Sequence, residues 1–232
     1  MTEEIDAILF DAGGTLFDMT PPREEVVSEV LARHGHRVDA ASVARALARA
    51  DGAFDREFAE LDGKNEEAFW TRYDDFLLDE LGFTGDKRKV SIDLNATFDE
   101  MIPKVSSWVD YPETKPVLDG LRRREFRLGV VSNATDLARR VLDSLGLTEY
   151  FDFILLSEEV GVRKPAPRIF HMAAGMADTR PSRCLFVGDK LAVDVMGARR
   201  VGMSAVLVDR NNAYPDAKCL RERDLSFFRK FV

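Results

Sequence analysis

The stretch Ala7–Asp18, AILFDAGGTLFD, decides the fold of this chain because it joins a buried strand to a polar turn. Its apolar run, residues 8–10, predicts a β-strand. The run ends at Asp11, and the two glycines that follow predict a tight turn. Position 13 holds glycine, so Asp11 has no second acid two residues after it. What this single carboxylate does depends on the residues that the rest of the chain brings to the same strand end.

Length and composition are those of a globular protein with a sizeable core. The chain has 232 residues, 45% of them hydrophobic and 32% charged, and its formal net charge is −8. An acidic chain lacks the basic face that non-specific nucleic-acid binding requires, so we expect no nucleic-acid partner. The two cysteines, Cys184 and Cys219, lack metal-type spacing, and a disulfide framework is not expected.

The sequence carries no signal for export or for membrane insertion. Its first residues, MTEEIDAILF, lack the basic start and the long apolar core of a signal peptide. No apolar run approaches the roughly 20 residues that span a bilayer. We therefore expect a cytoplasmic protein with no membrane partner, and the sequence leaves open whether it is a monomer or a homodimer.

The organisation of the chain changes near residue 109. Residues 19–108 show apolar positions at helical spacing and predict a helical domain. After residue 109, apolar strands alternate with helices, which is typical of a parallel sheet with right-handed crossovers. The sequence thus predicts an α/β fold, a doubly wound three-layer parallel sheet of Rossmann-like type. Its core domain comprises residues 1–18 and 109–232, and residues 19–108 form an inserted helical cap.

Three of the predicted strands end in polar residues. Asp11 ends the first, Ser132 and Asn133 end the second, and Asp189 ends the third, with Asp194 five residues further on. Because the carboxyl ends of parallel strands share one edge of the sheet, we expect these side chains to lie close together. The three aspartates are hard oxygen ligands of the kind that Mg²⁺ prefers.

The same edge carries groups that suit a phosphate. Ser132 offers a hydroxyl, and the turn after it offers N–H groups beside a helix N-terminus. Lys164 precedes a proline in a loop and can supply a positive charge to a phosphate and to Asp11. Each feature alone has a plainer explanation, as a turn residue, a helix cap or a surface lysine. Their occurrence together at separate strand ends favours a functional site.

With these residues in place, the chain resembles the haloacid dehalogenase-like (HAD) superfamily, whose members are mostly phosphatases. The first motif, usually Asp-x-Asp-Gly-Thr, appears here as the run Asp11–Thr15. Ser132 matches the second motif, Lys164 the third, and GDKLAVD with Asp189 and Asp194 the fourth. The resemblance extends over residues 5 to about 209. The long interval between the first two motifs is similar to the subclass with a helical cap of the C1 type.

The resemblance implies a Mg²⁺-dependent phosphatase that acts on a small phosphorylated metabolite. Asp11 would attack phosphorus and form an aspartyl-phosphate, and Ser132 and Lys164 would orient the phosphoryl oxygens. The metal ligands that it implies are Asp11, the Gly13 carbonyl, Asp189 and Asp194. The substrate-binding residues that it implies are Gly14, Thr15, Ser132, Asn133 and Lys164.

Gly13 departs from the family pattern, because the phosphatases have an aspartate there that protonates the leaving oxygen. Losing such a group typically costs about 10²–10⁴-fold in rate. The chain can still be a weakened or specialised phosphatase, with Asp18 or a cap residue replacing the acid. It can also be a non-catalytic binding or regulatory protein on the same frame.

Two further hydrolases remain open. A dehalogenase lacks the second aspartate, but its relatives tend to carry a bulky aromatic residue at that position and to lack the metal-binding fourth motif. A phosphonate hydrolase has a small residue there, but it needs a cap lysine for a Schiff base. The lysine at position 64, in DGKNEEAF, does not resemble the lysine motif of the phosphonate hydrolases.

Overall fold

The protein, described by a computed structural model over residues 4–61 and 64–230, divides into two compact units. An α/β unit contains the described residues up to Asp18, the segment Trp108–Arg210 and the described residues from Asp216 onward. A helical unit contains Met19–Ser107 and a second, short segment, Asn211–Pro215. That short segment lies in the range that the sequence analysis assigned to the core.

The α/β unit is built on a six-stranded sheet in which all neighbouring strands are parallel. Its first strand lies in the middle, with Phe10 opposite Val130 on one side and Val187 on the other. The predicted parallel α/β fold with a helical insertion is confirmed. In order across the sheet, the strands are β5 (Phe153–Leu156), β4 (Arg127–Ser132), β1 (Ala7–Phe10), β6 (Cys184–Gly188), β7 (Ser204–Val208) and β8 (Leu220–Glu222).

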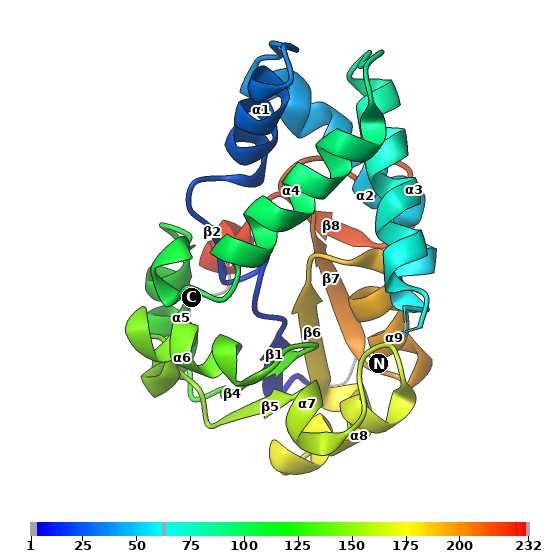
Figure 1. Cartoon of the computed structure of the whole chain (residues 1–232). Coiled ribbons are helices and arrows are strands. Elements are labelled where there is room, and N and C mark those ends of the chain that lie inside the picture. Colours follow the sequence, from blue (N-terminus) through cyan, green and yellow to red (C-terminus); the bar gives the residue numbers. More distant parts are fainter. Residues whose placement is uncertain (1–3, 62–63, 231–232) are drawn as a thin grey trace. The chain divides into compact units, whose positions relative to one another are not determined.

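Helices cover both faces of this sheet (Figure 1), which explains why its central strands are apolar on both sides. All of β1 is buried, and the Phe10 ring lies against Phe151 and Phe228. Helix α8 packs against β4 and α9 against β7, while α5 and α6 lie on the other side of the sheet. The helices of this unit are α5 (Thr114–Arg123), α6 (Asp136–Ser144), α7 (Ser157–Val160), α8 (Pro167–Met176) and α9 (Met196–Arg200).

The chain between β6 and α9 does not form a regular α-helix from its first turn. It begins with a π-helical turn, Leu191–Val195, in which the Lys190 carbonyl accepts hydrogen bonds from both the Asp194 and the Val195 N–H groups. The Asp194 carboxylate in turn accepts from the Lys190 N–H at 3.0 Å. These bonds hold the carboxylate against Gly188, at the end of β6. π-turns of this kind are frequent at functional sites.

Three short strands have no counterpart in the sequence prediction. β2 (Phe17–Met19) pairs with β3 (Trp108–Asp110), and β8 extends the edge of the main sheet. Each has three residues, which is too few for an alternating apolar pattern to be visible in the sequence.

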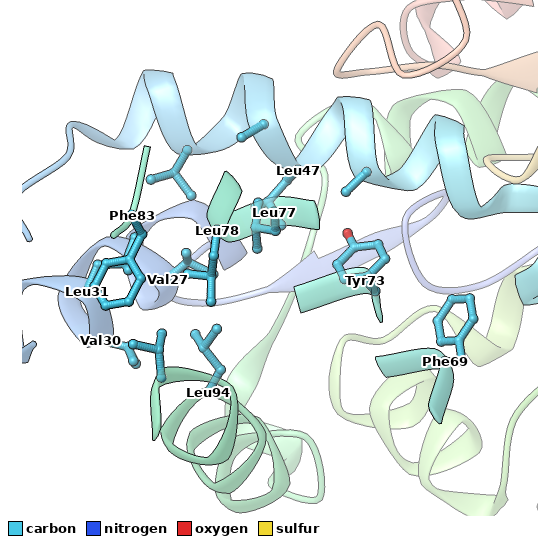
Figure 2. Packing of buried hydrophobic residues seen from close by; sticks show 14 of the residues in the cluster. Val27, Val30, Leu31, Leu47, Phe69, Tyr73, Leu77, Leu78, Phe83 and Leu94 are labelled. Atoms are coloured by element: carbon cyan, nitrogen blue, oxygen red, sulfur yellow. The ribbon is translucent and has the colours of Figure 1, made fainter. Parts of the chain in front are cut away.

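The helical unit has an apolar core, formed where the inner faces of its helices meet. Figure 2 shows this core, in which Leu31, Leu47, Leu77 and Leu78 lie with aromatic residues such as Phe69. Among the helices in the described ranges, none is both long and apolar enough to cross a membrane. The helices of this unit are α1 (Arg23–Arg33), α2 (Ala40–Ala59), α3 (Glu66–Glu80) and α4 (Lys87–Met101).

One carboxylate, Asp74, is buried in α3 beside this core. It accepts hydrogen bonds from the Ser91 hydroxyl and the Asn95 amide, both on α4. Burial nevertheless raises the pKa of Asp74 to about 6. The folded protein therefore prefers the neutral form of this side chain, which at neutral pH is ionised at a cost in stability.

We predict that Asp74→Asn stabilises the protein at pH 7.5 by about 1–3 kcal/mol. The folded-state pKa lies above the ordinary value, so Asp74 contributes most below about pH 4, and this contribution is lost as the pH rises toward 6. The variant lacks this loss, and its advantage grows from pH 4 to pH 7. Urea unfolding at pH 4.5 and pH 7.5 measures the difference.

Asp75→Asn is the matched control, because Asp75 is the exposed neighbour on the same helix. Because the Asp75 charge is the smallest cause of the shifted pKa of Asp74, this variant should change the unfolding free energy at pH 7.5 much less than Asp74→Asn does. An equal gain for Asp74→Asn at pH 4.5 and pH 7.5 would contradict the assignment to a buried charge.

Candidate active site

The predicted polar residues meet at the carboxyl edge of the sheet because β1 lies between β4 and β6. Asp11 follows β1, and its N–H donates to the Val187 carbonyl of β6 at 2.9 Å. Ser132 is the buried last residue of β4, and Asp189 directly follows β6. Asp194 reaches the same edge through the π-turn. Carboxylate oxygens of the three aspartates all lie within 4.8 Å of one another.

Lys164 enters this cluster from the loop before α8. Its Nζ lies 2.6 Å from Asp11 Oδ1 and 2.8 Å from Asp194 Oδ1. The side chain is 1% exposed, so the surface-lysine explanation is wrong. Its ammonium also lies 5.3 Å from the centre of the Phe186 ring. The lysine is therefore enclosed between two carboxylates and an aromatic face.

Asn133 holds the backbone of Lys164, and its expected contact with substrate stays a prediction. The Lys164 N–H donates to Asn133 Oδ1 at 2.7 Å, and Asn133 Nδ2 donates to the Lys164 carbonyl at 2.8 Å. Both ends of the amide are used in this pair. Asn133 thus links the end of β4 to the loop that carries the lysine.

The cluster has more negative than positive charge. Burial lowers the pKa of Lys164, but the Asp11 and Asp194 carboxylates outweigh burial, and the net pKa is raised. The pKa of Asp189 is raised to about 8, first by burial and further by Asp11 and Asp194, against the opposing effect of Lys190. The pKa of Asp194 is raised to about 6, mainly by burial. One lysine does not balance three carboxylates.

This donor set fits a hard divalent cation. Mg²⁺ takes a few carboxylate oxygens and keeps water or substrate oxygens in its remaining positions. The three aspartates offer such oxygens, and a cation among them would relieve the repulsion that raises the pKa of Asp189.

The turn after Asp11 is shaped around Asp189. Gly14 has a φ of +77°, and a Cβ there would lie 2.6 Å from Asp189 Oδ2. A Cβ on Gly13 would meet only a Phe17 ring carbon at 3.9 Å, which is ordinary contact. Glycine is therefore required at position 14 but not at position 13.

The other residues of this turn that are expected to contact substrate, Gly14 and Thr15, already use their N–H groups in hydrogen bonds within the protein. The Gly14 N–H donates to the Phe17 carbonyl at 2.8 Å, and the Thr15 N–H donates to the Ala12 carbonyl at 3.3 Å. The Thr15 hydroxyl is buried and has no hydrogen-bond partner. Of the two residues, Thr15 thus retains an unused polar group.

Two residues considered in the sequence analysis have defined places. Asp18 Oδ2 accepts a hydrogen bond from the Tyr111 hydroxyl at 2.6 Å. Lys64 lies exposed in the turn before α3, in the helical unit. Their roles as a replacement acid and a Schiff-base lysine stay predictions.

Sequence reasoning missed Arg210, which lies two residues after β7 and contacts the turn after Asp11. Its guanidinium donates to the Gly14 and Thr15 carbonyls. The one available signal was its place after a strand of the same sheet.

Comparison with known proteins agrees with this arrangement. A family model of haloacid dehalogenase-like hydrolases matches residues 5–202. A glyceraldehyde 3-phosphate phosphatase from Methanopyrus kandleri is 30% identical over 227 residues, which cover 97% of this chain and 92% of the relative. Other curated relatives match over 103 and 101 residues, and in these matches the chain spans 41% of their length.

Solved structures share the fold. A putative HAD-hydrolase, YfnB from Bacillus subtilis, bound to magnesium, is 20% identical with a TM-score of 0.64, and 99% of each chain is covered. An L-2-haloacid dehalogenase is 24% identical with the same TM-score of 0.64 and the same coverage. Because both kinds of protein have this fold, the fold does not distinguish between them. The match of the family model over most of the sequence, together with the relative that is similar over nearly its whole length, shows that the chain belongs to the haloacid dehalogenase-like hydrolases.

Proposed function

We propose that this chain is a Mg²⁺-dependent phosphatase that acts on a small phosphorylated metabolite through an aspartyl-phosphate on Asp11. The observation that carries the proposal is the buried cluster in which Lys164 holds Asp11 beside Asp189 and Asp194. The similarity to a phosphatase of small phosphorylated metabolites supports the same reaction class.

Asp11 is the nucleophile in this proposal. Lys164 Nζ lies 2.6 Å from its Oδ1, which limits the movement of the carboxylate and leaves Oδ2 to attack phosphorus. The bond from phosphorus to the leaving oxygen then breaks, and water hydrolyses the acyl phosphate and regenerates Asp11. The Lys164 ammonium and the Ser132 hydroxyl orient the phosphoryl oxygens, and their positions are set before substrate arrives.

The metal would be held by carboxylate oxygens of Asp11, Asp189 and Asp194 and by the Gly13 carbonyl. When bound, Mg²⁺ supplies the positive charge that allows a carboxylate to approach a phosphate dianion. The turn that contains Gly13 and Gly14 follows Asp11 and packs against Asp189. This packing keeps the two carboxylates close enough to bind one ion.

Gly13 limits the substrates. With no acid at this position, the leaving oxygen departs without a proton, which suits an acyl or aryl phosphate and not an alkyl phosphate. The Cβ position of Gly13 has room for a side chain. The limit on substrates therefore comes from the missing acid and not from the backbone around position 13.

The first test is phosphate release from acetyl phosphate, an aryl phosphate and a sugar phosphate, with Mg²⁺ and with EDTA. We expect release from the first two only, dependent on Mg²⁺, and a loss of about 10³-fold or more in Asp11→Asn. Asn keeps the size of the side chain and an acceptor for Lys164. Asp143→Asn, exposed near the C-terminal end of α6, is the control and should retain activity.

Other outcomes of this test assign the other functions. Halide release from a 2-haloacid, dependent on Asp11 but not on Mg²⁺, would identify a dehalogenase. Cleavage of a phosphonoaldehyde, lost in Lys64→Arg, would identify a phosphonate hydrolase. If no compound turns over above the Asp11→Asn background, the chain is a binding protein on this frame.

The second prediction concerns Gly14. Gly14→Ala should weaken Mg²⁺ binding about 10–100-fold, because the methyl group displaces the Asp189 carboxylate. Gly146→Ala is the control, since Gly146 also has a positive φ, +64°, but has no atom within 4 Å of its Cβ position. Titration calorimetry measures the affinity. Equal losses in both variants would show that backbone strain, and not Asp189, is responsible.

The third prediction adds the acid that the family pattern lacks. Gly13→Asp should fold, because its Cβ has room, and it should raise the rate on the sugar phosphate about 10²–10⁴-fold. The rate on acetyl phosphate should change little, because that leaving group needs no proton. Gly13→Asn has the same size without the acid and should show no gain. A gain in Gly13→Asn would contradict acid catalysis.

A further inference from the structure

A second charged assembly lies behind the turn that carries Asp11. Arg210 Nε donates to the Gly14 carbonyl at 3.3 Å, and its Nη2 donates to the Thr15 carbonyl at 3.0 Å. One guanidinium thus binds two successive carbonyls of the turn. A planar fork of N–H groups suits such a pair, and a lysine ammonium does not.

Arg210 is itself held on two further sides. Its Nη1 donates to Glu113 Oε1 at 2.7 Å, and its guanidinium lies 3.4 Å from the centre of the Tyr111 ring. The side chains of Arg210 and Glu113 are only 16% and 12% exposed, so water screens this ion pair little. The guanidinium therefore has a fixed position from which to hold the turn.

The segment that carries Tyr111 and Glu113 also binds the end of the turn. The Tyr111 N–H donates to the Leu16 carbonyl at 3.2 Å, and the Thr114 hydroxyl donates to the same carbonyl at 2.7 Å. Three successive carbonyls, at residues 14–16, are thus held from outside the turn.

The turn needs such support because two adjacent glycines lie in it. Glycine has more backbone freedom than any other residue, so Gly13 and Gly14 on their own hold the turn weakly. Gly14 also packs directly against Asp189. A shift of the turn would therefore change the distance between the Asp11 and Asp189 carboxylates.

We propose that Arg210 is a positioning residue, which fixes the turn after Asp11 and thereby the approach of the Asp11 carboxylate to substrate. This inference rests on the proposed function for its catalytic part. Arg210 does not touch the reacting atoms. It acts through the Gly14 and Thr15 carbonyls, with Glu113 and Tyr111 fixing its own position.

The test compares Arg210→Lys with wild type in two independent measurements. Amide hydrogen exchange of a peptide covering residues 11–17 reports the turn itself, and steady-state kinetics on acetyl phosphate with Mg²⁺ reports catalysis. We expect at least about 10-fold faster exchange in this peptide and a kcat lowered about 10–100-fold with KM within twofold. Glu113→Gln should move both quantities in the same direction by less.

Arg221→Lys is the control. Arg221 also pairs with a carboxylate at this edge of the sheet, and its Nη1 lies 3.1 Å from Asp209 Oδ2. It should leave exchange in residues 11–17 and kcat unchanged.

The outcomes separate this inference from the proposed function. Unchanged exchange of residues 11–17 in Arg210→Lys overturns the inference, whatever the activity. Faster exchange throughout the α/β unit, without a fall in kcat at nearly constant KM, shows general destabilisation and also overturns the inference. If wild type releases no phosphate, the proposed function and the catalytic part of the inference fail together, and the exchange result still decides whether Arg210 holds the turn.

Discussion

The ion pairs of Lys164 are the interaction on which the site and the sheet around it depend. An ammonium with 1% exposure is stable only if its charge is matched, and here Asp11 and Asp194 match it from the ends of two neighbouring strands. Removing Lys164 would leave two buried carboxylates without their positive partner, which is strongly destabilising, whereas removing one carboxylate leaves Lys164 paired with the other. Asn133 extends the assembly to β4 by holding the lysine backbone. The lysine thus ties three adjacent strand ends into one rigid group.

Close approach of these charges is possible because glycines lie where the carboxylates are packed. A Cβ on Gly188 would collide with the Asp194 carboxylate, and a Cβ on Gly14 would lie 2.6 Å from Asp189. The carboxylates therefore occupy the space that side chains at these positions would fill. Glycine at positions 13 and 14 also gives the turn after Asp11 more backbone freedom, so contacts from outside the turn, such as those of Arg210, limit its movement.

Local sequence patterns predicted the parts of the structure that have local causes. The apolar run of β1 and the polar residues after β1, β4 and β6 were visible, and so was the gathering of Asp11, Asp189 and Asp194 at one edge. Contacts between distant segments were not visible: Arg210 and Gly14 are 196 residues apart, and no periodicity relates them. The pairing of Asn133 with the lysine backbone and the π-turn depend on side-chain to backbone bonds, which short-range patterns do not encode.

The three aspartates of the cluster differ in how strongly they support a catalytic function. Asp11 and Asp194 each have a structural role in the fold, because both pair with the buried Lys164. Asp189 is different, since its carboxylate lies 3.7 Å from the Lys190 ammonium, and burial beside two like charges raises its pKa to about 8. Lys190 and Lys164 offset only part of this unfavourable environment, and an amide of the same size would avoid the repulsion. A cation shared with Asp11 and Asp194 would turn this unfavourable group into a ligand, so Asp189 is the residue that argues most directly for a metal-dependent reaction.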